Sequence, residues 1–310
     1  MELFHHDLKI DFLGARRWAM PLTLAFIALS IGSFFVKGFN FGIDFTGGVV
    51  MEVGYDQPVE LAEVRAALER GGIERAVAQH FGAANVLLLR LPPAADDQAT
   101  RVTAEVLGVL RGVDPSAQLR AREVVSPQVG DELTVQGFIA AAMALGGIFV
   151  YLLFRFEWRF AFGAIVATAH DVIFTVGWFS LFQIEFDLTV LAAVLAVIGY
   201  SVNDTVVVFD RIRENFRDMR KATPEEVMNA SVNQTMSRTV MTASTVFVVL
   251  VALLGWGGAV IHGFALALMI GLLVGTYSSV YIASAAALML GASRDDLMPP
   301  KRDDSLEEMP

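Results

Sequence analysis

Residues 188–209 read LTVLAAVLAVIGYSVNDTVVVF, and this stretch decides the fold. It is apolar over about the 20 residues that a helix needs to cross a bilayer, yet it contains Asp204. A carboxylate at membrane depth is energetically costly unless it is paired, hydrated or protonated. Asp204 is therefore a candidate functional residue. The alternative is a buried carboxylate that a neighbour neutralises and that only holds helices together.

The composition of the whole chain also indicates a membrane protein. Of the 310 residues, 55% are hydrophobic and 18% are charged, which is more apolar than a soluble chain needs. The formal net charge of -10 argues against nucleic-acid binding, because phosphates demand a basic surface. The sequence has no cysteine, which excludes disulfides, thiolate metal sites and cysteine nucleophiles.

Six apolar segments have the length of a transmembrane helix. They cover residues 18–36, 133–154, 160–182, 188–209, 239–256 and 261–290. The predicted fold class is an α-helical polytopic membrane protein with six transmembrane helices and one α+β domain outside the membrane. No small-residue cleavage site follows the first segment, so we expect that segment to be an uncleaved anchor.

Basic residues concentrate on one side of these segments. They are Arg16, Arg17, Arg155, Arg159, Arg211, Arg213, Arg217, Arg220, Lys221, Arg294, Lys301 and Arg302. The loops 183–187 and 257–260 contain neither Lys nor Arg. The positive-inside rule then places both termini in the cytoplasm.

This orientation predicts the domain organisation. In order, it gives a cytoplasmic N-terminus (1–17), a first transmembrane helix (18–36), a periplasmic domain (37–132), a five-helix transmembrane domain (133–290) that includes a cytoplasmic amphipathic segment (211–235), and a cytoplasmic tail (291–310).

Residues 37–132 have the size and mixed charge of a small water-soluble domain. The expected elements are strands 41–55, 75–81, 85–91 and 118–125 and helices 59–70 and 97–111. Their order, βαββαβ, is that of the ferredoxin-like split βαβ arrangement. Long segments cross the membrane despite their charges, so we expect this domain to face outward. No catalytic constellation stands out in it, and we expect His80 to be an ordinary strand residue.

Several polar residues surround Asp204. Ser201 lies three residues before it and Thr205 one residue after, so polar groups gather around the carboxylate on the helix surface. The amide of Asn203 can donate a hydrogen bond to it. Arg238 opens the fifth segment at a similar depth, where it either faces Asp204 or extends to the lipid headgroups. A carboxylate between an apolar environment and a cation can bind and release a proton as helices move.

Asp171 lies near the middle of the third segment, and we expect it a few turns deeper in the membrane than Asp204. Either a functional role or a bond to a neighbouring helix fits this position. His170 points roughly 100° away from Asp171 on a helix, so we do not expect both side chains to face one hydrated path equally well.

Two further patterns predict packing and helix ends. The sixth segment has a small residue at every fourth position, which predicts close packing against another helix. These residues are Gly271, Gly275, Ser279 and Ala283. Within 211–235, Thr223 is a predicted N-cap, with Pro224 at the first helical position and Glu226 completing a capping box. We expect this amphipathic segment to lie on the cytoplasmic membrane face.

Several stretches resemble a known family. Residues 41–48, FGIDFTGG, look like the opening signature of SecD and SecF proteins. Residues 199–215, GYSVNDTVVVFDRIREN, resemble the fourth-span signature of the SecF type, and residues 237–239 and 275–279 are further matches. The signature residues are Gly42, Asp44, Phe45, Gly47, Gly48, Gly199, Tyr200, Ser201 and Thr205. By these motifs the chain is identified as a member of the SecD/SecF family, within the resistance-nodulation-division superfamily.

This resemblance implies an auxiliary subunit of the bacterial Sec export machinery in the inner membrane, and not an enzyme. The implied partners are SecD as an obligate partner, the SecYEG channel with its small subunits, the translocating preprotein and membrane lipid. Protons are the implied coupling ion, without a cofactor. By position, Asp204 is the implied proton carrier, Arg238 its cationic partner, and Asn203 and Asp171 secondary members of the relay.

Two alternatives remain open. The chain could be half of a small-molecule exporter of the same superfamily, although residues 37–132 are short for a drug-binding porter domain. It could also be an intramembrane aspartyl protease with Asp171 and Asp204 as the dyad, although no Gly-x-Gly-Asp sequence surrounds either residue.

Overall fold

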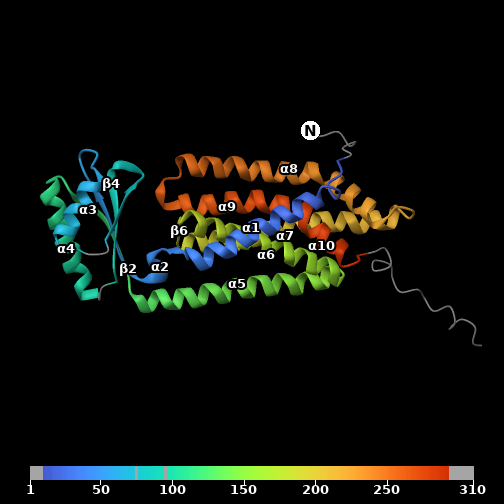
Figure 1. Ribbon diagram of the computed structural model, residues 1–310, viewed down its shortest axis with the longest axis horizontal. Helices are drawn as coiled ribbons and strands as arrows, with labels where there is room; N and C mark the ends of the chain where they lie inside the picture. The colour runs from blue at the N-terminus through green and yellow to red at the C-terminus, as the bar shows by residue number, and fades with distance from the viewer. Residues whose placement is uncertain (1–9, 74–75, 94–95, 293–310) are drawn as a thin grey trace, which may run out of the picture.

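A computed structural model describes residues 10–73, 76–93 and 96–292. Long helices run side by side in a bundle, and an α+β domain stands at one end of it, which we call the domain end (Figure 1). The expectations for residues 1–9, for Arg75 and for residues 293–310 of the tail lie outside the described residues.

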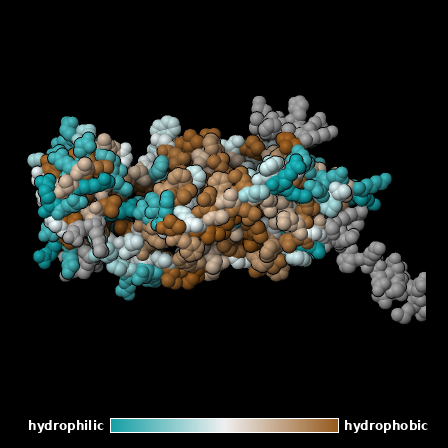
Figure 2. Space-filling view, viewed as in Figure 1, coloured by the Kyte–Doolittle hydropathy of each residue, from teal (hydrophilic) through white to brown (hydrophobic). Residues whose placement is uncertain are grey.

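The prediction of six transmembrane helices is confirmed for the described residues. The helices are α1 (Arg16–Val36), α5 (Pro127–Arg155), α6 (Trp158–Phe182), α7 (Leu188–Asp218), α8 (Pro224–Trp256) and α9 (Ala259–Ser278), which a π-helical turn (Ser279–Ala283) joins to α10 (Ser284–Met289). Hydrophobic side chains cover the middle of the bundle in Figure 2, and hydrophilic ones cover the α+β domain and the opposite end. This distribution is the one that a bilayer around the bundle requires.

The polar segment 211–235 does not form a separate surface helix. Its first part continues α7, and its second part begins α8. Asn215 joins the two parts, because its amide donates to Ser231 Oγ and to Gln234 Oε1, each at 2.8 Å. The predicted cap is confirmed: Thr223 and Glu226 form a capping box at the start of α8. The segment is therefore a helical hairpin that extends the bundle away from the domain.

The domain has the βαββαβ order that its sequence predicts. Its elements are β2 (Gly48–Gly54), α3 (Leu61–Arg70), β3 (Val77–Phe81), β4 (Ala83–Leu91), α4 (Asp96–Val113) and β5 (Gln118–Val125). In the described residues the strands form an antiparallel sheet in the order β3-β4-β2-β5. Alternate residues of β2 and β4 are buried against α3 and α4, so the helices cover one face of the sheet.

The expectation of one continuous strand over residues 41–55 is wrong. A two-residue strand β1 (Asn40–Phe41) and a short helix α2 (Ile43–Thr46) precede β2. Gly47 and Gly48 have φ of +68° and +142°, which residues with a Cβ rarely adopt. A Cβ on Gly47 would also lie 2.8 Å from the backbone nitrogen of Pro127. The two glycines therefore turn the chain sharply where the domain meets the start of α5.

The small-residue face of the last span packs inside this chain. A Cβ on Gly275 of α9 would lie 3.3 Å from Cβ of Ser201 on α7. The predicted close packing is therefore confirmed, with α7 as the partner helix. Few residues in the apolar parts of α5 and α8 are buried in the chain alone, and these helices lie on opposite edges of the bundle (Figure 1).

Candidate functional site

The most polar point inside the bundle is the carboxylate of Asp171 on α6. Its side chain is fully buried. Oδ2 accepts hydrogen bonds from Ser201 Oγ of α7 at 2.5 Å and from Ser278 Oγ of α9 at 2.7 Å, and Oδ1 lies 2.9 Å from Nδ1 of His170. A buried carboxylate with these partners ties α6, α7 and α9 together at one level.

His170 belongs to this cluster, contrary to the expectation from helix geometry. The angle of roughly 100° between successive residues separates the Cβ directions, but the imidazole reaches back across it to Asp171. His170 is 4% exposed, and its other neighbours include the rings of Phe174 and Tyr277. His170 and Asp171, although adjacent in the sequence, therefore belong to the same polar site.

Ser278 was not a predicted site residue. It lies at the last position of α9, and the π-helical turn Ser279–Ala283 follows at once. Single π-helical turns inside α-helices occur often at functional sites. The available sequence signal was a serine in the GTYSS stretch of an apolar span, one turn after Gly275. Because Gly275 has no side chain, α9 can approach Ser201 and Asp171 closely.

Asp204 has a different environment. It is 3% exposed on α7, and its Oδ2 has no hydrogen-bond partner among the described residues. The hydroxyl of neighbouring Thr205 is likewise buried without a partner in the described chain. Because Ser201 precedes Asp204 by three residues, Asp204 lies only about 4.5 Å along the helix from the level of Asp171. The expectation that Asp171 is a few turns deeper is therefore wrong.

Arg238 and Asn203 lie outside the buried cluster. Both are exposed in the chain alone. No salt bridge or hydrogen bond joins Arg238 to Asp204 in the part of the chain that the structure describes. Asn203 has no hydrogen bond to Asp204 within that part either. The structure thus brings Asp171, Ser201, Ser278 and His170 together, with Asp204 one turn away.

The FGIDFTGG segment connects the domain to α7. Asp44 Oδ2 accepts a hydrogen bond of 2.8 Å from the backbone N–H of Leu188, the first residue of α7. β1 pairs in parallel with β6 (Glu185–Phe186), which leads directly into α7, and the N–H of Gly42 donates to the carbonyl of Phe186 at 2.9 Å. Arg90 of β4 forms an ion pair with Glu185. The helix that carries Asp204 is therefore bonded to the base of the domain.

The geometry excludes a carboxylate dyad. Both oxygens of Asp171 already have partners, and no hydrogen bond joins Asp171 to Asp204 among the residues described. An aspartyl protease needs two carboxylates that share a proton, so that alternative is not supported. Within residues 10–73, 76–93 and 96–292, no group of three His, Asp or Glu side chains is arranged to hold a metal ion.

Comparisons with known proteins agree with the motifs. The family described as "Protein export membrane protein SecD/SecF, C-terminal" matches residues 105–293, and the "SecD/SecF GG Motif" matches residues 32–59. The protein translocase subunit SecF of Vibrio alginolyticus is 48% identical over 96% of this chain and 97% of its own. SecF of Escherichia coli O157:H7 is 43% identical over 97% of this chain and 94% of its own.

Solved structures give the same result. The crystal structure of SecDF, a translocon-associated membrane protein from Thermus thermophilus, matches 93% of this chain at 39% identity with a TM-score of 0.84. SecDF in its super-membrane-facing form matches 92% of the chain with a TM-score of 0.69. This chain spans only 40% of the first SecDF chain. On the strength of these matches and of its motifs, the chain belongs to the SecD/SecF family of protein export membrane proteins.

Proposed function

We propose that this chain is the SecF-type half of a SecD–SecF assembly that uses the proton-motive force to promote preprotein translocation across the bacterial inner membrane. It would act after the SecA ATPase and the SecYEG channel have started export. One observation carries the coupling proposal: Asp204 is a membrane-depth carboxylate, buried and without a hydrogen-bond partner at Oδ2 among the described residues. Intramembrane carboxylates of this kind mark proton relays.

The two carboxylates have different roles in this proposal. Asp171 has a full set of partners, so it fixes the contact between α6, α7 and α9. Asp204 has no hydrogen-bond partner at Oδ2 among the described residues, so it can gain or lose a proton without breaking bonds that hold the helices together. Arg238 provides the opposing charge when α8 and α7 approach each other. Asn203, exposed beside Asp204, serves the relay at the surface of this chain.

The signature segment transmits the change to the domain. A shift of α7 acts on Asp44, which is bonded to Leu188, and on β1, which is paired with β6. The GG turn and the ion pair of Arg90 with Glu185 then pass the movement to the sheet. SecDF has been solved in a form named super-membrane-facing, which this chain matches with a TM-score of 0.69, against 0.84 for the other SecDF structure.

SecD completes the membrane part in this proposal. Asn203 and Arg238 are exposed at membrane depth in the chain alone, and polar groups there require cover. The solved SecDF chain contains more than twice the length matched here, which is consistent with a second half. SecYEG and the preprotein complete the set of partners that we propose.

The orientation that we propose places the domain in the periplasm and both termini in the cytoplasm. Arg16, Arg155, Arg159 and Arg211 all lie at helix ends away from the domain, as the positive-inside rule requires. The connections between α6 and α7 and between α8 and α9 lie at the domain end and contain no Lys or Arg.

Asp204→Asn tests the proposal. The amide keeps the size of the side chain but cannot exchange a proton, so export of a slow Sec substrate should fall to the rate of a strain lacking the chain. Asp218→Asn is the matched control, because Asp218 is an exposed acid at the end of the same helix. Co-purification with SecD must be equal in both variants. Normal export in an assembled Asp204→Asn complex would refute proton coupling at this residue.

The small-molecule exporter is the weaker alternative. Between α1 and α5 the chain provides one small α+β unit, which is too small for a porter domain. The matched family is also named for protein export. A deletion strain with increased drug sensitivity and normal secretion would favour the exporter.

A further inference from the structure

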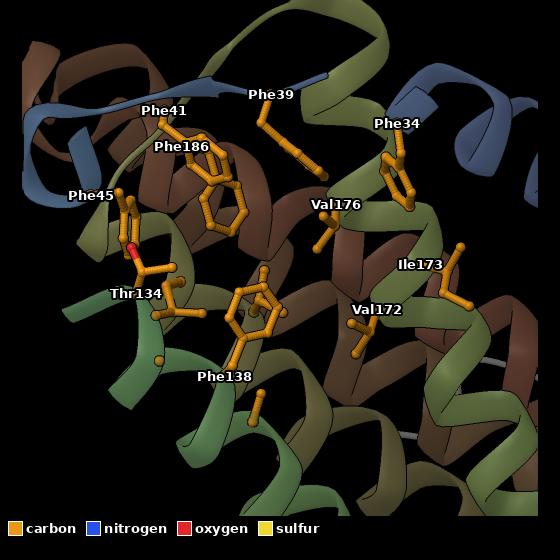
Figure 3. Close-up of a pocket in the computed structure, with 14 residues that line it drawn as sticks. Phe34, Phe39, Phe41, Phe45, Thr134, Phe138, Val172, Ile173, Val176 and Phe186 are labelled. Atoms are coloured by element: carbon orange, nitrogen blue, oxygen red, sulfur yellow. The ribbon is translucent and has the colours of Figure 1, made fainter. Parts of the chain in front are cut away.

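A cavity of about 370 Å³ lies inside the membrane-spanning region, toward the domain end (Figure 3). Val172, Ile173 and Val176 of α6 form its floor, while Phe34 of α1 and Phe138 of α5 stand on opposite sides. The aromatic rings of β1, α2 and β6 close its domain end. The cavity opens between α1 and α5, where Phe138 is 73% exposed.

The lining is apolar almost throughout. Thr134 is the single polar side chain among the described lining residues, and its hydroxyl already donates to the carbonyl of Gly130 at 2.9 Å. An extended peptide in this cavity would therefore leave its backbone N–H and C=O groups without partners, at a high cost in a membrane. A hydrocarbon chain has no such groups. The chemistry of the lining thus favours an acyl chain over a peptide.

The volume suits the same occupant. A water or a methylene group occupies about 30 Å³ in a liquid, so a cavity of about 370 Å³ has room for roughly 12 such groups. That is enough for the greater part of one fatty-acyl chain. Water does not fill such a space, because cavities lined by hydrocarbon stay dry.

A cation marks the place of the headgroup. Lys37 follows α1 directly and lies three residues after Phe34, hence on the same side of the helix. The next lining residue is Phe39. The ammonium of Lys37 is exposed and donates to the carbonyl of Leu181 at 2.8 Å, and it keeps further donors for a phosphate. The cavity and this charge together match the tail and head of one phospholipid.

We propose that this cavity is a phospholipid site, which takes one acyl chain from the leaflet at the domain end and holds the phosphate near Lys37. The bound chain contacts Phe45 of the signature segment and Val172, the neighbour of Asp171. It therefore lies between the base of the domain and the helix that carries the buried polar cluster. The proposal stands independently of proton coupling at Asp204.

Photolabelling tests this site. The full chain is reconstituted in nanodiscs that contain a phospholipid with a diazirine at mid-tail, irradiated and mapped by mass spectrometry. Adducts are expected on Val172, Ile173 and Val176 of α6, which line the cavity and are only partly exposed in the chain alone. Ala141→Phe fills the cavity from α5 and should lower these adducts about tenfold. Ala142→Phe is the matched control, since Ala142 is exposed on the same helix and does not line the cavity.

Three outcomes would overturn the proposal. Equal labelling of the floor in both variants would mean that the lipid contacts are only annular. Labelling confined to the outward side chains of α5 would exclude an inserted chain. Loss of floor labelling when SecD is bound would make a partner helix the occupant. Should Ala141→Phe fail to fold, Val176→Phe fills the same space from α6. Lys37→Ala should reduce labelling by a phosphate-bearing probe more than labelling by free fatty acid.

Discussion

Replacing Asp44 by Ala tests how the domain is connected to the membrane helices. Asp44 lies in α2, outside the bundle, yet its carboxylate accepts the backbone N–H of Leu188 at 2.8 Å. The first four N–H groups of a helix have no partner inside the helix, so this bond satisfies one of them on α7. Asp187 satisfies another, because its Oδ1 accepts the N–H of Val190 at 2.8 Å.

The size of the effect follows from two contributions. Loss of a capping side chain costs about 1 kcal/mol. Removal of a negative charge from an exposed helix N-terminus costs a further 0.3–1 kcal/mol, approximately. Together they predict that local opening of the α7 N-terminus becomes easier by about 1–2 kcal/mol, which is a factor of about 5–30 in the opening equilibrium. The Asp187 cap and the β1–β6 pairing remain, so the helix itself should stay folded.

Hydrogen exchange of the full chain measures this opening directly. The peptide that covers β6 and the first turn of α7 should exchange about 5–30 times faster in Asp44→Ala than in the unmodified chain. Asp44→Asn should lie between them, because the amide oxygen still accepts the bond but the charge is gone. Asp131→Ala is the control, since Asp131 is an exposed acid in the first turns of α5 at the same end. Equal exchange in Asp44→Ala and Asp131→Ala would refute the capping argument.

Two further substitutions address the domain and the buried cluster. The Tyr55 hydroxyl has no partner among the described residues, and burial, with a smaller effect of the nearby Asp114 charge, raises the pKa of Tyr55 to about 12. Its neutral form is favoured in the folded domain, so the domain should lose stability as pH rises from about 10 toward 12. Thermal unfolding at pH 8 and at high pH should show this loss in the unmodified chain but not in Tyr55→Phe. Gly275→Ala should be tolerated, because the gain of about 1 kcal/mol in helix propensity offsets a Cβ contact of 3.3 Å with Ser201. Gly275→Leu should lower the stability of the bundle by at least about 1–3 kcal/mol, because the larger side chain would separate Ser278 from Asp171. Melting temperatures in detergent that are equal for Ala and Leu would contradict this packing.

The sequence predicted the spans well because the bilayer imposes both their length and their apolarity. It predicted the ends of α5 and α8 less well, since both begin with polar turns outside the apolar run. The cap at Thr223 was recognisable, but the hydrogen bonds of Asn215 that make a hairpin depend on two segments that meet only in the fold. Likewise, FGIDFTGG alternates like a strand, and its turn at Gly47 follows from contact with Pro127.

Within the site, the rarity of polar residues in apolar spans was a useful signal, whereas positions counted along the predicted helices were a weak one. Asp204 and Ser201 were identifiable because polar groups are costly at membrane depth. Ser278 was missed because serine is common in transmembrane helices and, alone, predicts nothing. The predicted depth of Asp171 was wrong because it was counted from predicted helix ends. The hydrogen bond from Ser201 instead places Asp171 at the same depth in the bundle as Ser201.

In the proposed relay, the contrast between the two buried carboxylates favours Asp204 over Asp171 as the proton carrier. Asp171 accepts two serine hydroxyls and contacts His170, and these bonds hold α6, α7 and α9 together. Asp204 has no such bonds at Oδ2 among the described residues. A proton that arrives at this level therefore disturbs the bundle least at Asp204. We infer that the Asp171 cluster serves as the fixed point against which α7 moves, and that Asp204, one turn away on that helix, is the group that exchanges the proton.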